Sequence, residues 1–180
     1  MLINFESKFI TMFIMLSYNY FLLGVLVFFL FFYGCCIGSF INVLIYRLPI
    51  KQSIIYPRSY CIECGTSISW YDNIPILSWL LLLGKCRSCK TKISFTYPLI
   101  EFITGIVFIT NSYSNPSFYI ALPFIPKVIL GSIFASICLT LSLLDYKYFW
   151  LPRIITFSGI FIGVFFSLII DLTYNLIQFN

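Results

Sequence analysis

Apolar stretches separated by polar segments fill most of this 180-residue chain, and one polar segment is much longer than the others. A helix that crosses a bilayer needs about 20 mostly apolar residues. Four stretches come close to that length, at about residues 20–46, 97–110, 127–144 and 154–170. The pattern predicts an all-α polytopic membrane protein with about four transmembrane helices and a polar loop between the first and the second.

These elements divide the chain into three parts. We expect an N-terminal segment with the first transmembrane helix, then a cysteine-rich loop, then a membrane domain with three helices, at residues 1–46, 47–97 and 98–180. Ser17-Tyr18-Asn19-Tyr20 interrupts the first apolar run and indicates an interfacial start before the first span. Short connections are expected at residues 111–126 and 145–153, where prolines or charges separate the apolar runs.

Composition and charge support this topology. Hydrophobic residues make up 61% of the chain and charged residues 9%, whereas soluble domains contain about 25% charged residues. The net charge of +5 does not indicate a nucleic-acid partner, because seven of the eleven Lys and Arg residues lie in segment 47–97, beside predicted spans. The positive-inside rule places this loop in the cytoplasm and both termini outside, with the lipid bilayer around the helices. The absence of histidine excludes histidine-based catalysis and histidine metal ligands.

Two shorter patterns concern packing. Gly34, Gly38 and Asn42 are four residues apart and share one helix face, and such a G-x-x-x-G pair lets another helix approach closely. Ile76–Leu83 is apolar apart from Ser78 and is too short to span a bilayer. We expect this segment to pack against either the membrane surface or the small core of the loop itself.

The loop holds four of the seven cysteines as two C-x-x-C pairs with 21 residues between them. This arrangement is typical of a four-thiolate zinc site, because each pair forms a tight knuckle and the connecting segment lets the knuckles face each other. The cytoplasm disfavours disulfides, while a redox dithiol or unpaired thiols are the other interpretations. Four protein ligands leave no open position, so the expected Zn²⁺ is structural. The predicted ligands are Cys61, Cys64, Cys86 and Cys89.

Two carboxyl groups are candidate catalytic residues. Asp145 ends an apolar helix near the predicted water line, where it is either a topological stop or a functional group. Glu101 is expected at the same depth on the neighbouring span. Paired carboxyl groups have pKa values that are pushed apart, which gives aspartic peptidases one acid and one base. The pair therefore makes a functional role for Asp145 more plausible than its position alone does.

Several stretches combine into a more specific signal. They are Gly38–Pro49, the cysteine quartet, Asp72–Leu80, Ile93–Glu101 and Leu144-Asp145 with Leu151-Pro152 after it. In this order, over roughly residues 34–160, the chain resembles the type IV prepilin leader peptidases. These are membrane aspartic peptidases that also N-methylate the new amino terminus.

The resemblance implies a pair of catalytic aspartates at the cytoplasmic face of the bacterial inner membrane, of which the first corresponds to Asp145. It implies prepilins or pseudopilins as substrates, cleaved after the leader's glycine by an activated water molecule without a covalent intermediate. It also implies S-adenosylmethionine as the methyl donor, with the cysteine loop associated with this second activity.

The sequence departs from the family pattern at three places. Thr96 stands where the family usually has arginine, and Arg153 stands where it usually has aspartate. The second catalytic aspartate belongs to a Gly-x-Gly-Asp motif beyond the fourth span, and the chain reaches Asn180 without one, so we expect a C-terminally truncated member. Three interpretations follow. The chain is a peptidase whose second aspartate comes from another chain or a second copy (or is replaced by Glu101), a catalytically incomplete zinc-bearing membrane interaction protein, or a protein that keeps only methyl transfer.

Overall fold

The computed structural model of the chain describes residues 3–113 and 121–178, where five α-helices and one short 3-10 helix form and no β-strand does. In chain order these are α1 (Ile3–Arg47), η1 (Trp70–Asn73), α2 (Leu77–Leu81), α3 (Thr96–Tyr113), α4 (Ala121–Tyr148) and α5 (Arg153–Gln178). The prediction of a helical protein is confirmed.

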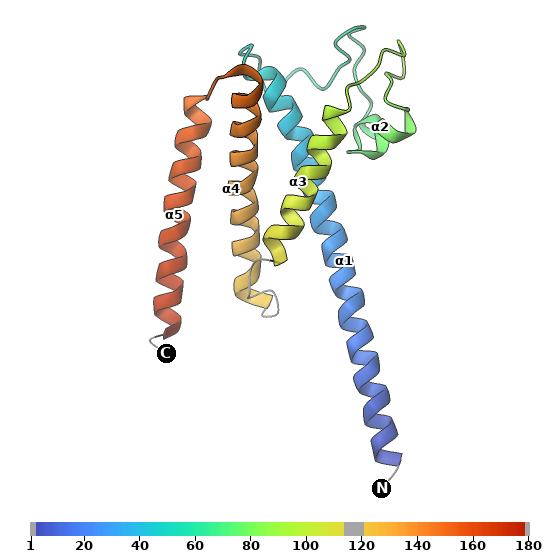
Figure 1. The fold of residues 1–180 in the computed structure, drawn as a ribbon, viewed down its shortest axis with the longest axis vertical. Helices are drawn as coiled ribbons and strands as arrows, with labels where there is room; N and C mark the ends of the chain where they lie inside the picture. Colours follow the sequence, from blue (N-terminus) through green and yellow to red (C-terminus); the bar gives the residue numbers. More distant parts are fainter. Residues whose placement is uncertain (1–2, 114–120, 179–180) are drawn as a thin grey trace.

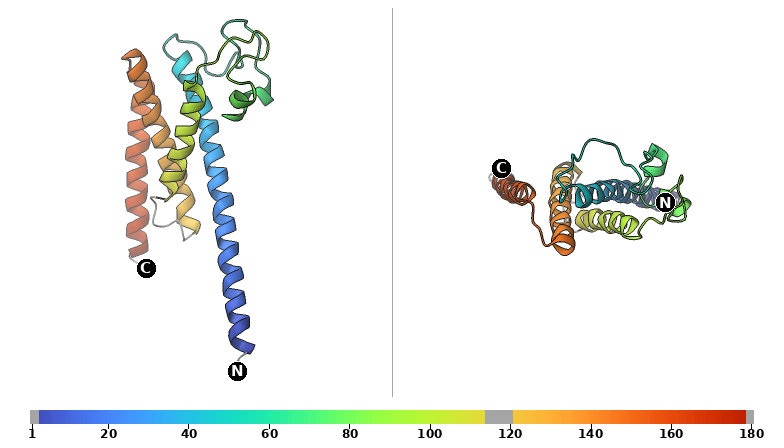
Figure 2. Two further views of the ribbon diagram at one scale, coloured as in Figure 1. Left: turned by 45° about the vertical axis from the view of Figure 1, so that its right-hand side comes forward. Right: turned by 90° about the horizontal axis from the view of Figure 1, so that it is seen from above.

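The four long helices lie roughly alongside one another, and the segment between α1 and α3 projects from one end of them (Figures 1 and 2). We call this segment, residues 48–95, the cysteine loop. The end of α1, the start of α3, the end of α4 and the start of α5 all lie at the loop end of the molecule (Figure 1). The start of α1 and the end of α5 lie at the opposite end.

The helix boundaries differ from the predicted ones. α1 is a single helix of 45 residues that continues through Ser17-Tyr18-Asn19-Tyr20, because these residues cost a helix much less than glycine or proline does. α4 begins at Ala121, so it includes part of the expected connection 111–126; its first proline lies in the first helical turn, where a missing N–H costs little. α4 also continues to Tyr148, so the first residues of the expected turn 145–153 are helical.

Among the residues described, two stretches are long and apolar enough to cross a membrane, Tyr20–Arg47 in α1 and Val128–Tyr148 in α4. α5 contains the shorter apolar stretch Ile155–Phe165, and α3 has 18 residues, close to the minimum length of a span. The structure thus gives two candidate membrane helices, and four spans remain a prediction.

α1 packs most closely against α3, through the glycine face expected from the sequence. A β-carbon on Gly34 would lie 2.8 Å from the Cα of Gly105, and one on Gly38 would lie 2.7 Å from the Cα of Glu101. These distances leave no room for a side chain, so the two backbones cross as closely as such small-residue faces allow. This crossing places Glu101 directly against α1.

A small apolar cluster fixes the end of α4 at the loop end of the molecule. Ile41 and Ile45 of α1 pack with Leu144 of α4, and all three side chains are buried. The next residue, Asp145, is exposed in the last turn of α4. The cluster therefore sets the position at which Asp145 reaches the surface.

Candidate metal centre and carboxyl groups

The two C-x-x-C pairs fold into knuckles that share the same backbone hydrogen bonds. In the first knuckle, the N–H of Cys61 donates to the carbonyl of Thr66 and the N–H of Gly65 donates to the carbonyl of Cys61, both at 2.9 Å. The second knuckle repeats these bonds 25 positions later, at 2.9 and 3.1 Å. An antiparallel bridge closes each knuckle, Tyr60 with Ser67 in the first and Lys85 with Lys92 in the second.

This correspondence reflects an internal repeat, Cys-x-x-Cys-x-Thr-x-Ile-Ser, at residues 61–69 and 86–94. The two knuckles share one more backbone hydrogen bond. The N–H of Ile68 donates to the carbonyl of Ser59 (2.8 Å), and the N–H of Ile93 donates to the carbonyl of Gly84 (2.7 Å). Sequence reasoning found the cysteines but missed the repeat, although the Thr-x-Ile-Ser after each pair was a visible signal.

The four cysteine sulfurs converge between the knuckles. All of them lie within 4.8 Å of one another, and the Sγ atoms of Cys61 and Cys89 are 3.8 Å apart. Four sulfurs at about 2.3 Å from a tetrahedral Zn²⁺ would lie about 3.8 Å apart. The structure therefore brings all four predicted ligands together in a cluster that can bind a metal ion.

Two threonines of the repeat favour the thiolate form of the second cysteine in each pair. The Sγ of Cys64 lies 3.3 Å from the hydroxyl of Thr66, and the Sγ of Cys89 lies 3.2 Å from that of Thr91. Each thiol donates to the hydroxyl oxygen, and once the thiol loses its proton the hydroxyl can donate to the thiolate instead. This stabilises the charged form, so these contacts lower the pKa of Cys64 and lower the pKa of Cys89 to about 6. Cysteine binds a metal ion as the thiolate. Hydrogen-bond partners such as these threonines also orient the metal-binding side chains.

Cys61 shows the opposite behaviour. The backbone N–H of Cys64 lowers the pKa of the Cys61 thiol, but desolvation and hydrogen bonds with the thiols of Cys64 and Cys86 raise it to about 11 overall. Four thiols this close cannot all lose their protons unless a cation joins them, because neighbouring thiolates repel one another. A bound metal ion would supply that positive charge.

The second knuckle is fastened to the middle of the cysteine loop by an ion pair. Arg87 donates from Nε and an Nη atom to the two carboxylate oxygens of Asp72, at 2.7 and 2.6 Å, and its guanidinium lies 5.5 Å from the ring centre of Tyr71. The bonds from Arg87 lower the pKa of Asp72. This contact gives the arginine between the two cysteines of the second pair a structural role.

Arg47 fastens the start of the loop to the end of α1. Its side chain is 5% exposed and donates to the carbonyls of Ser53 (3.0 Å) and Arg58 (3.3 Å). A buried arginine that donates to backbone carbonyls stabilises the fold, in addition to any effect of its charge on membrane orientation. Sequence reasoning counted Arg47 only as a positive charge at the membrane boundary.

Glu101 is buried, with 8% exposure, at the junction of α1, α3 and the loop. Its Oε2 accepts a 2.7 Å hydrogen bond from the N–H of Ile76, and the Ser39 side chain also hydrogen-bonds to it. Ile76 has φ 61° and ψ −53°, and the N–H of the next residue donates to the carbonyl of Pro75 at 2.6 Å. This is a classic γ-turn, a rare and strained conformation. The turn points the Ile76 N–H at the Glu101 carboxylate, and the resulting hydrogen bond stabilises the turn.

Asp145 lies at the end of α4 and not at the junction of α1, α3 and the loop. Its side chain is exposed at the end of α4, while its backbone carbonyl accepts from the N–H of Phe149 at 2.8 Å. In the part of the chain that the structure describes, no hydrogen bond joins Asp145 to Glu101. Both residues belong to the loop end of the molecule, as expected, but their pairing as a catalytic dyad stays a prediction.

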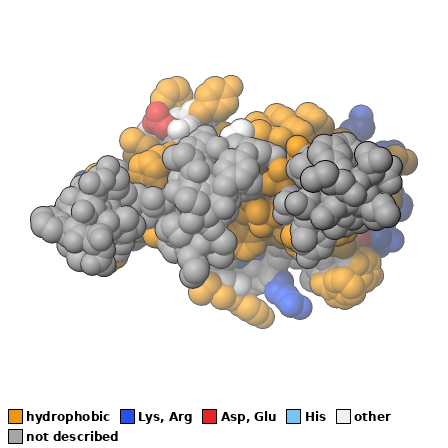
Figure 3. Space-filling view, turned by 90° about the horizontal axis from the view of Figure 1, so that it is seen from below, with side chains coloured by type: hydrophobic (Ala, Val, Ile, Leu, Met, Phe, Trp, Pro, Cys, Tyr) orange, Lys and Arg blue, Asp and Glu red, His pale blue; other side chains and the backbone are white. Residues whose placement is uncertain are grey.

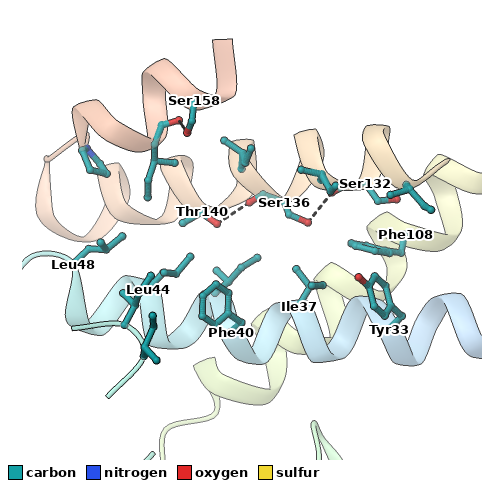
Figure 4. Close-up of a pocket in the computed structure, with 18 of the residues that line it drawn as sticks. Tyr33, Ile37, Phe40, Leu44, Leu48, Phe108, Ser132, Ser136, Thr140 and Ser158 are labelled. Carbon is teal, nitrogen blue, oxygen red and sulfur yellow. Dashed lines mark hydrogen bonds between the residues drawn. The ribbon is translucent and has the colours of Figure 1, made fainter. Parts of the chain in front are cut away.

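An apolar cleft of about 990 Å³ lies between α1, α4 and α5. Tyr33, Ile37 and Phe40 of α1 line one wall, and Ser132, Ser136 and Thr140 line the opposite wall on α4 (Figure 4). The hydroxyls of Ser136 and Thr140 each donate to the carbonyl four residues earlier, at 2.7 Å. The cleft also reaches Trp150, Pro152 and Arg153, which follow Asp145 in the chain.

Comparison with known proteins relates this chain to a family of bacterial peptidases. Residues 32–114 match the family model described as "Bacterial Peptidase A24 N-terminal domain". The chain is 40% identical over 136 residues to a prepilin leader peptidase/N-methyltransferase of Myxococcus xanthus and 40% identical over 130 residues to one of Vibrio cholerae. It is 36% identical over 149 residues to a type 4 prepilin-like proteins leader peptide-processing enzyme of Escherichia coli.

These similarities cover 76, 67 and 73% of this chain, but 38, 48 and 53% of the respective relatives. The chain thus spans about half the length of these curated relatives or less. No solved structure matches the chain. The matched family domain contains α3, the whole cysteine loop and the part of α1 that packs against α3.

Proposed function

The chain belongs to the bacterial prepilin leader peptidase family, and on that premise we propose that it forms part of such a peptidase in the membrane. It cleaves the leaders of type IV prepilins or pseudopilins at the cytoplasmic face of the inner membrane. One structural observation supports this proposal most directly: Asp145 is exposed at the loop end of α4, on a helix end that the buried Leu144 fixes against α1.

The proposed topology has four spans, formed by α1 from about Tyr20 and by α3, α4 and α5. The cysteine loop faces the cytoplasm, because segment 47–97 has seven basic and two acidic residues, and both termini lie outside. The three proposed parts, residues 1–46, 47–97 and 98–180, then place the catalytic carboxyl and the loop on the same side of the membrane.

Asp145 is one of the two carboxyl groups that the reaction needs. Two carboxyl groups that share one proton let one act as a base toward water while the other acts as an acid toward the scissile peptide. We propose that the second group approaches Asp145 from another polypeptide segment or from a second copy of this chain. The exposure of Asp145 supports this arrangement, because an exposed carboxyl group is accessible to a partner from another chain or copy.

Glu101 is the alternative second carboxyl within this chain. Its carboxylate already accepts from Ile76, and Ser39 also hydrogen-bonds to it. To act on water beside Asp145, it would have to release a strained turn. We therefore assign Glu101 a supporting role, in which it positions the loop against α1 and α3.

The four cysteines hold a structural Zn²⁺ in this proposal. Cys61, Cys64, Cys86 and Cys89 fill all four positions of a tetrahedral ion, which then fixes the two knuckles and supplies no catalytic group. The names of two of these relatives include N-methyltransferase. Together with the motif resemblance, those names support S-adenosylmethionine as a methyl donor.

The test is cleavage of a prepilin-like substrate in membranes by the chain alone and by the chain with the remaining half of a relative supplied as a second polypeptide. Asp145→Asn should lower the cleavage rate by about 10²–10⁴-fold. Glu63→Gln, which changes an exposed carboxyl group that is not part of the proposed catalytic pair, is the matched control, and zinc content together with helix content confirms that each variant is folded.

The outcomes separate the interpretations. Loss of cleavage in Asp145→Asn but not in Glu101→Gln assigns the reaction to Asp145 and an external carboxyl group. Loss in both variants makes Glu101 the second member of the pair. No cleavage by the folded, zinc-loaded chain under either condition would replace the peptidase with a zinc-bearing membrane interaction protein.

A further inference from the structure

Helix α2 and the turn after it carry a group of exposed leucines. Ser78 and Trp79 hold this segment to the cysteine loop, because the Ser78 hydroxyl donates to the carbonyl of Tyr71 and the Trp79 indole N–H donates to that of Ile93, both at 3.1 Å. The leucines lie on the side that these anchors leave free. Their exposures are 52% for Leu77, 55% for Leu80, 78% for Leu81 and 81% for Leu83.

The depth of α2 is fixed by its first hydrogen bond. The N–H of Ile76, which precedes α2, donates to Glu101 at 2.7 Å. Glu101 lies five residues after the start of α3 at Thr96, or about 7.5 Å along the helix axis. The start of α2 therefore lies beside α3 rather than beyond its end, and both ribbon views show α2 below the tips of the loop (Figures 1 and 2).

The surface around this point is apolar on the helices as well. Phe102 and Ile103, which follow Glu101 on α3, are 49 and 40% exposed. Seen from below, hydrophobic side chains and several Lys and Arg side chains lie close together at the right-hand side of the molecule (Figure 3). Lys85 and Lys92, bridged in the second knuckle, are exposed and follow the leucines in the chain.

We propose that α2 and Leu83 form an interfacial anchor whose leucines insert among the acyl chains of the leaflet on the loop side. The partner is the lipid surface itself. Exposed apolar side chains at the depth of a span favour acyl chains, and lysines just outside them favour anionic headgroups. The anchor holds the cysteine knuckles at the membrane surface, at the same end of the molecule as the end of α4 that bears Asp145 (Figure 1).

This inference depends on the membrane placement proposed above and not on the cleavage reaction. It also decides between the two sequence expectations for Ile76–Leu83. The small core of the loop uses Ser78 and Trp79, whereas the leucines remain free for the membrane surface.

The experiment places an environment-sensitive fluorescent amino acid at Leu81 in the full chain, reconstituted in vesicles of phosphatidylcholine and phosphatidylglycerol. The same label at Phe29, 63% exposed on α1, reports the bilayer interior, and at Ile62, 57% exposed between two metal ligands, it reports the knuckle. Quenching is measured with nitroxide-labelled acyl chains and with aqueous iodide. Zinc content confirms the fold of each labelled chain, and Leu83 serves as a second labelling site.

If α2 is an anchor, nitroxide lipids remove most of the fluorescence at position 81, as they do at position 29, and iodide removes little. Position 62 shows the reverse. Equal iodide quenching at positions 81 and 62 overturns the proposal, because the leucines then face water. Protection of position 81 from both quenchers also overturns it, because a protein surface then covers α2. Neither result requires peptidase activity, so failure of the anchor and failure of the enzyme are distinguishable.

Discussion

The two sides of α1 differ in how they are packed. On the side toward α3, Gly34 and Gly38 allow backbone contact, and the buried Glu101 ties the helices to the loop. On the side toward α4 and α5, a cleft of about 990 Å³ remains between the helices. We call these the closed side and the cleft side.

Two polar groups on each side show a further difference. On the closed side, Glu101 and Asn42 bond to other elements, the latter donating to the carbonyl of Tyr97 at 3.1 Å. On the cleft side, the hydroxyls of Ser136 and Thr140 bond within their own helix. A lining whose polar groups are already satisfied presents an essentially apolar surface. The closed side therefore holds its two helices in one arrangement, whereas the cleft side leaves an apolar surface between its helices.

The largest expected effect is that of metal removal, and it should be confined to the loop. Structural Zn²⁺ sites contribute roughly 10 kcal/mol or more of binding free energy. Chelation, or Cys86→Ser, should therefore expose the basic residues of the second knuckle to trypsin. The α1–α3 contact does not include the knuckles, so helix content measured by circular dichroism should change little.

The control for metal removal is Cys138→Ser, which removes an exposed thiol of α4 outside the cluster and should leave one zinc per chain. A metal-free chain whose loop resists trypsin as well as the parent would show that the knuckles do not depend on a metal. The loop would then owe its order to contacts such as those of Arg47 and Arg87.

The next largest effect concerns the closed side directly. Gly38→Leu puts a β-carbon 2.7 Å from the backbone of Glu101, so the helices must separate. We expect a loss of about 3 kcal/mol or more of stability, seen as a lower denaturation temperature in detergent. Gly24→Leu is the matched control, because a β-carbon there meets nothing within 4 Å. Equal tolerance of both substitutions would show that α1 and α3 do not cross at Gly38.

A smaller effect is expected at the bond between α3 and the loop. Glu101→Ala leaves the Ile76 N–H without its partner, which costs about 1–3 kcal/mol for a buried donor. Glu101→Gln keeps a carbonyl oxygen as acceptor and should retain most of this stability. Faster amide exchange at Ile76 and Leu77 in the alanine variant alone would support the contact. Equal exchange in the parent and both variants would contradict it.

The sequence predicts a feature when the residues that determine it form a pattern within a short stretch of the chain. Cysteine pairs and glycine spacing encode their contacts within a few residues, so the metal cluster and the closed side could be predicted. The bond from Ile76 to Glu101 could not, because the carboxylate that accepts from the γ-turn at Ile76 lies 25 positions away in the chain. The cleft could not be predicted either, because serines that bond to their own helix look like any polar stripe in a sequence.

The smallest effect is expected on the cleft side, at Ser136. Its hydroxyl donates to the carbonyl of Ser132, which already belongs to the helical hydrogen-bond pattern, so Ser136→Ala should change stability by less than about 0.5 kcal/mol. Denaturation temperature in detergent measures this change beside Thr104→Val, where the hydroxyl makes the same kind of bond, to Ile100, on the closed side. If Ser136→Ala destabilises the protein more than Thr104→Val does, the serine has a partner across the cleft. The contrast between the two sides of α1 would then be wrong at its most specific point.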